Sequence, residues 1–291
     1  MQKENFLIDE LRHPVLSGHS NSEEWRRVQL KRIRDMVKEN EKEIINALKN
    51  DLEKPSTEAF FEVIAILQEL KVAETNLKAW MRPQKIEVPF SLKPGSATIK
   101  LEPLGCALII GPWNYPFSLT IQPLISALAA GNTAVIKPSE HALNTSELIA
   151  KIIPKYFPQN VVQVIQGDGY IAKELISKSF DHIFFTGGSE VGKKVMQAAA
   201  NHLTPVTLEL GGKSPAIILE GTNIEIAAKR IIWGKGLNSG QTCIAPDHIL
   251  IKEELHKPLI KSMKSTISCF YGNQPLQSKN LGKIINKHHF K

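Results

Sequence analysis

Apolar residues near the N-terminus recur every three to four positions, and this period predicts two long amphipathic helices. The first spans residues 22–50, and the second runs from Thr57 to Trp80. The second helix carries two adjacent aromatic residues, Phe60 and Phe61, which could be mistaken for a ligand-binding pair. Because they lie within a helical pattern of apolar residues, we expect them to pack in the core.

Beyond Pro83 the period of the apolar residues changes to two. They alternate with other residues over 86–90 and again over 97–101, and Pro94-Gly95 marks a turn between the two runs. This pattern predicts a two-stranded hairpin within residues 84–102. An isolated hairpin is marginally stable in water, so we expect it to lean on another surface or on another subunit.

From Cys106 onward, short apolar strands alternate with helical segments. The predicted strands cover 107–111, 133–137, 161–165, 182–186, 206–210 and 216–219, and the predicted helices cover 117–130, 140–156, 170–178, 189–200 and 223–236. This order is typical of an α/β fold with a doubly wound parallel sheet and helices on both faces. Ligands bind such sheets at the carboxyl ends of the strands, so the loops there are the candidates for chemistry.

The composition indicates a folded globular chain. Its 291 residues are 42% hydrophobic and 22% charged, which suffices for a buried core and fits one large or two ordinary domains. The net charge of +7 comes from lysines and arginines that are spread along the chain, mostly beside acidic residues. Because no basic stripe and no nucleic-acid-binding motif is present, we expect no nucleic-acid partner.

The cysteines and the ends of the chain bear on its compartment. Cys106, Cys243 and Cys269 are far apart and show no metal-ligand spacing, which suits a reducing cytoplasm and argues against a disulfide framework or a metal site. The N-terminus lacks the apolar segment of a signal peptide. The longest weakly charged stretch, residues 104–136, is interrupted by prolines and glycines, so we expect no membrane span.

One of the cysteines lies in a segment suited to a reactive thiol. Cys243 ends the sequence Asn-Ser-Gly-Gln-Thr-Cys (238–243), in which Gly240 allows a tight turn, and a strand-like segment follows at 248–252. A nucleophilic cysteine needs partial exposure and stabilising dipoles. Most lone cysteines, in contrast, are small buried hydrophobes. The local sequence leaves both interpretations open.

Two loops after predicted strands carry candidate polar groups. Asn114 lies between two prolines and could donate its amide to a developing oxyanion, or it could satisfy its own turn backbone. Lys137 and Glu140 are three residues apart at a helix start and could clamp a ribose from two sides. The acidic first turn of an ordinary helix explains Glu140 equally well.

Two glycine-containing loops compete for the role of a pyrophosphate site. Residues 167–172 match the loose dinucleotide fingerprint, which is weak evidence when it stands alone. Residues 186–192 open a helix whose free N–H groups and dipole suit an anion. The sequence pattern alone does not separate the two loops.

Glu209 stands at the apolar end of a predicted strand and is followed by Gly211 and Gly212, which allow a close approach. A carboxylate buried there would have a raised pKa and could act as a general base. Pairing with a lysine such as Lys213 is the alternative.

Taken together, these segments resemble the aldehyde dehydrogenase superfamily. The motifs, in chain order, are Pro-Trp-Asn-Tyr-Pro (112–116), Lys-Pro-Ser-Glu (137–140), Phe-Thr-Gly-Gly-Ser-Glu-Val-Gly (185–192), Leu-Glu-Leu-Gly-Gly-Lys (208–213) and Gly-Gln-Thr-Cys (240–243). Each is modest alone, but five in this order are highly specific, and the resemblance covers almost the whole chain. Cys-Ile-Ala-Pro-Asp (243–247) is most similar to the class 3 branch, which includes fatty and aromatic aldehyde dehydrogenases.

The resemblance implies oxidation of an aldehyde to a carboxylic acid through a cysteine thiohemiacetal and a thioester. Cys243 is then the nucleophile, the Asn114 amide and the Cys243 backbone N–H hold the oxyanion, and Glu209 activates water. Tyr115 and Trp233 are implied to line the aldehyde tunnel.

The resemblance also implies an NAD cofactor, with NADP possible. Lys137 and Glu140 are then placed on the adenosine ribose, with Trp113 nearby. The implied pyrophosphate region consists of Gly187, Gly188, Ser189, Glu190, Val191 and Gly192.

The implied organisation is a nucleotide-binding domain of residues 1–83 and 103–207, an oligomerisation arm at 84–102 that could form a homodimer, and the N-terminal part of a catalytic domain at 208–291. The family's downstream Glu-Ile-Phe-Gly-Pro motif, whose glutamate holds the nicotinamide ribose, is not found in this sequence. The resemblance therefore implies a chain that is truncated at its C-terminus. A remnant that at most binds nucleotide, and a cysteine hydrolase with cofactor-independent esterase activity, are the alternatives.

Overall fold

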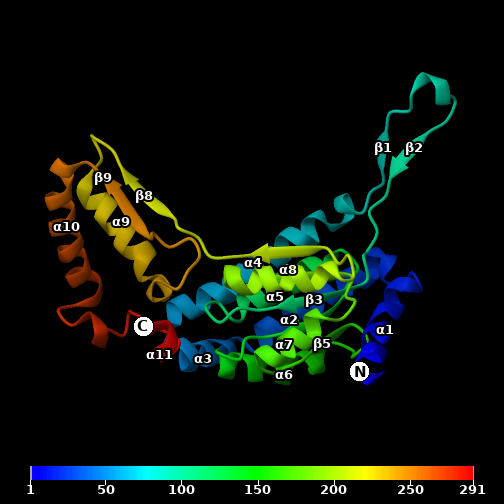
Figure 1. Cartoon of the computed structure of the whole chain (residues 1–291), viewed down its shortest axis with the longest axis horizontal. Helices are drawn as coiled ribbons and strands as arrows, with labels where there is room; N and C mark the ends of the chain where they lie inside the picture. The colour runs from blue at the N-terminus through cyan, green and yellow to red at the C-terminus, as the bar shows by residue number, and fades with distance from the viewer. Residues whose placement is uncertain (1, 291) are drawn as a thin grey trace.

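The computed structural model describes residues 2–290, and these form an α/β fold with three separate sheets (Figure 1). A five-stranded sheet with its covering helices makes up the centre of the molecule. A hairpin projects from one end of this centre, and a smaller unit of two strands with two helices lies at the other end. The central sheet has the doubly wound architecture that the sequence predicts.

The N-terminal helices correct one prediction. Helix α1 (Gln2–Leu16) lies before the predicted pattern, and the single helix predicted over 22–50 is wrong, because α2 (Glu23–Glu39) and α3 (Glu41–Leu52) meet at Asn40. The Asn40 side chain donates hydrogen bonds to the Met36 carbonyl at 2.8 Å and to the Tyr156 hydroxyl at 3.0 Å. A side chain that bonds the backbone in this way competes with a continuous helix.

Helix α4 (Ser56–Trp80) agrees with the second predicted helix, but not with its predicted core residues. Phe60 and Phe61 are 39% and 51% exposed, so the prediction that they pack in the core is wrong. They lie just beside the buried stripe, because successive residues of a helix point in directions about 100° apart. The buried apolar residues of this stripe are Ala59, Val63, Ile66, Leu70, Ala73 and Leu77.

The central sheet has five parallel strands in the order β5-β4-β3-β6-β7. These strands are β3 (Cys106–Ile110), β4 (Thr133–Lys137), β5 (Val162–Val164), β6 (His182–Thr186) and β7 (Val206–Glu209). The chain builds outward from β3 to β5 and then returns to pair β6 with the other side of β3. A reversal of this kind leaves a crevice outside the carboxyl ends of β3 and β6, where such folds bind ligands.

Helices cover both faces of this sheet and form two separate cores. Helices α5 (Ser118–Ala129) and α6 (Leu143–Tyr156) pack with α2, α3 and α4 on one face, whereas α1, α7 (Gly169–Ile176) and α8 (Ser189–Ala200) pack on the other. Within β3, Ile109 enters the first core and Leu108 the second. Burial on both faces explains why these strands read as continuous apolar runs.

The predicted hairpin is present. Strands β1 (Gln84–Ile86) and β2 (Ala97–Ile99) pair antiparallel and extend away from the rest of the chain (Figure 1). At its tip, Phe90 is 88% exposed. Because the hairpin projects away from the chain, its contact with another subunit stays a prediction.

The smaller unit follows β7. Strands β8 (Pro215–Ile218) and β9 (His248–Ile251) form a parallel pair that is connected by α9 (Ile224–Gly236) and followed by α10 (Glu253–Tyr271), which the sequence pattern did not predict. The division into domains near residue 208 stays a prediction. The remaining short elements are the 3₁₀ turns His19–Asn21, Phe90–Leu92, Leu237–Gly240 and Pro275–Gln277, and helix α11 (Lys287–Phe290).

None of the helices formed by residues 2–290 combines the length and the apolar character that a membrane crossing requires.

Candidate active site

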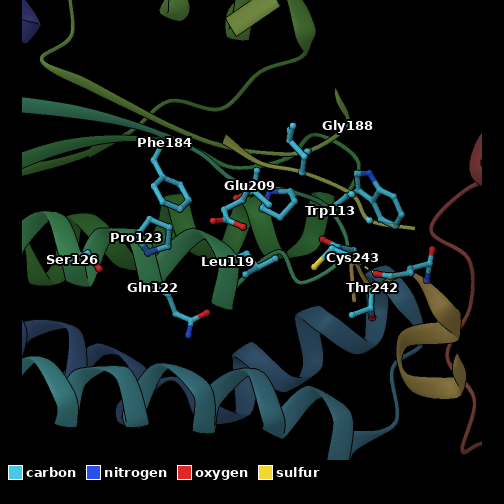
Figure 2. Close-up of a pocket in the computed structure, with 18 of the residues that line it drawn as sticks. Trp113, Leu119, Gln122, Pro123, Ser126, Phe184, Gly188, Glu209, Thr242 and Cys243 are labelled. Carbon is cyan, nitrogen blue, oxygen red and sulfur yellow. Dashed lines mark hydrogen bonds between the residues drawn. The ribbon is translucent and has the colours of Figure 1, made fainter. Parts of the chain in front are cut away.

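A cavity of about 540 Å³ opens where the carboxyl ends of β6 and β7 face helix α5 (Figure 2). Loops that follow three strands of the central sheet meet there with the segment that ends at Cys243. Among the residues predicted to form the site, the cavity wall contains Trp113, Asn114, Gly187, Gly188, Glu209 and Cys243. Segments separated by more than a hundred residues are therefore brought together at the predicted edge of the sheet.

The segment before Cys243 has an unusual backbone. Asn238, Ser239 and Gly240 have positive φ angles of 52°, 55° and 78°. This left-handed region is unfavourable for residues other than glycine, and such strain is concentrated at functional sites. Cys243 itself is exposed, and its backbone N–H has no acceptor among residues 2–290. The exposure favours a reactive thiol over a small buried hydrophobe.

A close backbone contact joins this segment to the loop after β7. A Cβ atom at Gly212 would lie 2.7 Å from the Cys243 carbonyl oxygen, so any larger residue would push the two loops apart. Near the same contact, the Asp247 N–H donates to the Ser214 carbonyl at 2.9 Å. Gly212 therefore allows the loop that carries Glu209 to approach the cysteine segment.

The Asn114 loop contacts the cysteine segment directly. Asn114 Nδ2 donates to the Gln241 carbonyl at 2.9 Å, and Asn114 Oδ1 accepts from the Tyr115 N–H at 3.0 Å. The second N–H of the amide meets no acceptor among residues 2–290. The amide oxygen thus satisfies the backbone of its own turn, and the role of the amide as an oxyanion donor stays a prediction.

The two predicted tunnel residues differ in their surroundings. The Tyr115 hydroxyl lies 2.7 Å from Thr242 Oγ1, next to Cys243 in the chain, and burial raises the pKa of the phenol. Trp233 lies on α9 and is 56% exposed. Neither side chain is part of the cavity wall, so their role in an aldehyde tunnel stays a prediction.

Glu209 is solvent-exposed, which contradicts the expectation that it is buried. Its position at the last residue of β7, at the rim of the sheet, explains the difference. Pairing with Lys213 is not observed either, because the Lys213 ammonium lies 3.5 Å from Asp247. The Glu209 carboxylate has no hydrogen-bond or ionic partner among residues 2–290, and Figure 2 shows it in the same cavity as the Cys243 thiol.

The two glycine loops are distinguished by their helix caps. At α7, the Asp168 carboxylate accepts from the Tyr170 N–H at 2.9 Å and from the Ile171 N–H at 3.4 Å, so a side chain of the protein already occupies the anion position. At α8, the cap residue Gly188 provides no such bond, and a Cβ atom there would meet nothing within 4 Å. The uncapped N–H groups and the open space at the start of α8 fit a phosphate, because the positive end of the helix dipole favours an anion there.

Lys137 and Glu140 form an ion pair at the carboxyl end of β4. Lys137 Nζ lies 2.5 Å from Glu140 Oε2, and the lysine is 2% exposed. Burial acts to raise the pKa of the Glu140 carboxyl, but the hydrogen bond and charge of Lys137 outweigh it, so the pKa is lowered overall. An ionised carboxylate at this edge of the sheet fits the ribose of a dinucleotide, which presents hydroxyl donors.

Trp113 contacts the end of the described chain. The centre of its ring lies 4.4 Å from the centre of the His289 ring in an edge-to-face arrangement. His289 belongs to α11. Partial burial and the nearby His141 and His288 lower the pKa of His289. The remaining predicted cofactor residues, Ser189, Glu190, Val191 and Gly192, form the first turn of α8 outside the cavity wall.

Sequence analysis missed several polar residues that shape the site. Gln241, Thr242 and Asn238 precede the cysteine and bond to the Asn114 loop. Lys54, just before α4, and Glu62, within α4, support that loop.

Of these residues, Glu62 carried a signal in the sequence. It falls on the buried stripe of α4 together with Ala59, Val63 and Ile66. The apolar wall residues Leu119, Pro123 and Phe184 carried no local signal.

Comparison with known proteins identifies the family of the chain. Residues 19–291 match the Aldehyde dehydrogenase family. The chain belongs to this family.

Three relatives illustrate how far the similarity extends. The chain is 46% identical to "Aldehyde dehydrogenase family 3 member A2" of Macaca fascicularis over 285 residues, which are 98% of this chain and 59% of that protein. It is 42% identical to "Aldehyde dehydrogenase, dimeric NADP-preferring" of Canis lupus familiaris, covering 100% of this chain and 64% of that protein. The solved "Substrate bound state of Staphylococcus Aureus AldH" superposes with a TM-score of 0.94 at 40% identity, covering 100% of this chain and 63% of that one.

These relatives confirm the resemblance to the class 3 branch, since the first is named as a family 3 member. The chain spans about three fifths of their length, 59% to 64%.

Proposed function

We propose that this chain oxidises an aldehyde to a carboxylic acid with hydride transfer to NAD or NADP. The observation that carries the proposal is the meeting of Cys243, Glu209 and Asn114 in one cavity. Oxidative acyl transfer needs a nucleophile, a base for water and a donor for the oxyanion, and these three side chains supply the three functions.

In the first step, the Cys243 thiolate attacks the carbonyl carbon of the aldehyde. A carbon–sulfur bond forms, and the carbonyl electron pair becomes an oxyanion. The second N–H of the Asn114 amide and the Cys243 backbone N–H, which have no acceptor among residues 2–290, donate to this oxygen.

In the second step, the thiohemiacetal becomes a thioester when its carbon–hydrogen bond breaks. NAD(P), when bound, supplies the acceptor for the hydride that leaves. Glu209 then removes a proton from water, whose oxygen attacks the thioester carbon, and the carbon–sulfur bond breaks to restore the Cys243 thiolate. The unpaired, solvent-exposed carboxylate of Glu209 is suited to this transfer, because it has no bond to give up first.

The cofactor is held by the edge of the central sheet. The uncapped first turn of α8, with Gly187, Gly188 and residues 189–192, binds the pyrophosphate. Lys137 and Glu140 contact the adenosine ribose and Trp113 lies beside it. A carboxylate at this position favours the free hydroxyls of NAD, although the canine relative is named NADP-preferring.

Further assignments follow from the same proposal. Tyr115 and Trp233 border the path of the aldehyde. The exposed hairpin at 84–102 is an arm for a homodimer, since the canine relative is named as dimeric. Residues 1–83 and 103–207 form the nucleotide-binding domain, and residues 208–291 form part of the catalytic domain.

The test is to follow NADH formation by the purified 291-residue chain with a medium-chain aldehyde and with an aromatic aldehyde. We expect turnover that is lost in Cys243→Ala and kept in Cys269→Ala, which removes another exposed thiol. A folded chain that binds NAD without turnover would contradict the proposal and support the nucleotide-binding remnant. Hydrolysis of esters without any cofactor-dependent oxidation would instead support a cysteine hydrolase.

A further inference from the structure

A fully buried ion pair lies behind the cavity. Lys54 precedes α4 and Glu62 lies within it, and each side chain is 1% exposed, with Lys54 Nζ 2.5 Å from Glu62 Oε1. Removing two charges from water is costly, so buried ion pairs are weak contributors to net stability. The contacts of this pair point to a more specific role.

Both members of the pair bond to the loop that carries Asn114. Lys54 Nζ donates to the Asn114 carbonyl at 2.9 Å and lies 4.1 Å from the centre of the Tyr115 ring. Glu62 Oε2 accepts from the Phe117 N–H at 3.2 Å and from the Ser118 N–H at 2.9 Å. The loop is thus fixed at both ends, from Asn114 to the start of α5, by charged groups that cannot move without losing their partners.

The same stretch of α4 also holds the cysteine segment. Glu58, one turn before Glu62, accepts from the Asn238 N–H at 2.8 Å, and Asn238 Nδ2 donates to the Asn114 carbonyl at 2.7 Å. Burial raises the pKa of the Glu58 carboxyl, opposed by the Asn238 bond and by Lys54. The Asn114 carbonyl is therefore the point at which Lys54, just before α4, and the cysteine segment both bond to the Asn114 loop.

We propose that the Lys54–Glu62 pair is a positioning device for the oxyanion donor: by clamping the Asn114 carbonyl and the start of α5, it sets the place of the Asn114 amide relative to Cys243. This inference rests on the proposed function in taking Asn114 as the donor. Neither Lys54 nor Glu62 is part of the cavity wall, so both act through the loop. A displacement of about 1 Å at a reacting group slows catalysis by roughly 10²-fold, which sets the scale of the effect.

The experiment measures acylation of Cys243 by p-nitrophenyl acetate in the full 291-residue chain, a reaction that needs neither cofactor nor hydride transfer. The variants are Lys54→Met, Asn114→Ala and the combination of both. Lys252→Met is the matched control, because it breaks an exposed ion pair in which Lys252 Nζ lies 2.8 Å from Glu220 Oε2. The double substitution Lys54→Met/Glu62→Gln, which removes both buried charges, replaces the single one if Lys54→Met does not fold.

We expect Lys54→Met to slow acylation by about 10- to 100-fold and Lys252→Met to leave it unchanged. Because Lys54 acts through Asn114, adding Lys54→Met to Asn114→Ala causes little further loss, which a merely structural role would not produce. Two results would overturn the proposal. One is unchanged acylation in a folded Lys54→Met chain, and the other is a rate loss in the combined variant that equals the product of the two single losses.

Hydrogen exchange separates this proposal from the proposed function. The Phe117 and Ser118 amides, which donate to Glu62, should exchange faster in the Lys54→Met and double variants than in Lys252→Met, while β3 amides stay protected. Unchanged exchange overturns the positioning role, whatever the acylation rates are. If Asn114→Ala leaves acylation unchanged, the oxyanion role assigned under the proposed function fails, and faster exchange at Phe117 and Ser118 would still show that the pair holds the loop.

Discussion

Two regions of the molecule contain a cysteine and a glutamate and place them in opposite environments. In the buried interior of the central unit, Cys106 of β3 packs on one face of the sheet, whereas Glu62 of α4 lies on the other face. Cys106 is fully buried and Glu62 is 2% exposed, and the Glu62 carboxylate accepts bonds from a lysine and two backbone N–H groups. At the cavity, Cys243 and Glu209 are both exposed, and the Glu209 carboxylate has no partner among residues 2–290.

The difference separates groups that hold the structure from groups that are free to react. Protonation of a buried carboxylate that already accepts three bonds weakens those bonds, whereas an exposed carboxylate without partners has none to weaken. Burial raises the pKa of the Cys106 thiol to about 12, with nearby Asp181 acting in the same direction, so it stays protonated under ordinary conditions. The buried groups hold the frame, and under the proposed function the exposed groups on that frame carry out the chemistry.

The largest expected contrast is in thiol reactivity. At pH 8 a thiol with a pKa of about 12 is ionised to only about one part in 10⁴. We therefore expect iodoacetamide to modify Cys243 and Cys269 at least about 10³-fold faster than Cys106. Mass spectrometry of the digested chain after timed alkylation measures the three rates. Comparable rates for Cys106 and Cys243 would show that the environments of the two thiols do not differ as described.

The two glutamates should differ in their effect on stability. Glu62→Ala leaves Lys54 buried without its counter-charge, so we expect the free energy of unfolding to fall by about 3–5 kcal/mol. Glu209→Ala removes an exposed side chain without partners, and we expect a change within about 0.5 kcal/mol. Urea unfolding followed by circular dichroism compares the two variants. Equal losses would mean that Glu209 also carries structure.

In catalysis we expect the large effect at the exposed glutamate, Glu209. With Glu209→Gln, the thioester forms but water is no longer activated, so we expect a retained burst of NADH and a steady-state rate lower by about 10²- to 10³-fold. Glu220→Gln, at another exposed glutamate, is the matched control. Steady-state turnover that is unchanged in Glu209→Gln would exclude this residue as the base.

The smallest effect is the pH dependence that Cys106 contributes. Its folded pKa, about 12, is raised above the ordinary value of 9.0, so the unfolded chain loses this proton first as the pH rises. The contribution to stability is thus complete below pH 9 and declines between pH 9 and 12, by about 1.4 kcal/mol at pH 10. Urea unfolding at pH 8 and pH 10 should show this extra decline in the native chain but not in Cys106→Ala, and Cys269→Ala should retain it. An identical decline in Cys106→Ala would assign the effect to other groups.

Much of the fold was predictable because its signals are local. The strands at 133–137 and 182–186 and the helix at 189–200 agree with the structure at both ends, since apolar runs buried on both faces are bounded by clear turn residues. The helix predicted over 22–50 was wrong because the break depends on the Asn40 side chain and on Tyr156, which is more than a hundred residues away. No periodicity in the sequence carries that contact.

Part of the cavity wall was predictable from the sequence, but the environments of its residues were not. The motifs singled out Asn114, Gly187, Gly188, Glu209 and Cys243, which all line the cavity. The sequence did not decide between the glycine loops by pattern alone, because the difference is that Asp168 caps its own helix. It also placed Glu209 in a buried position, because an apolar strand end looks the same in sequence whether it finishes inside the sheet or at its rim.

The sequence by itself determined the alternation of strands and helices from Cys106 to Gly236, the parallel sheet and the family to which the chain belongs, because periodicity and short motifs are properties of neighbouring residues. Only the tertiary structure decided that Lys54 and Glu62 lie behind the Asn114 loop, that Gly212 meets Cys243, and that one cysteine is buried while another is exposed. The physical reason is that burial and hydrogen-bond partners depend on which distant segments meet. In this chain those segments meet at the carboxyl ends of β3, β6 and β7.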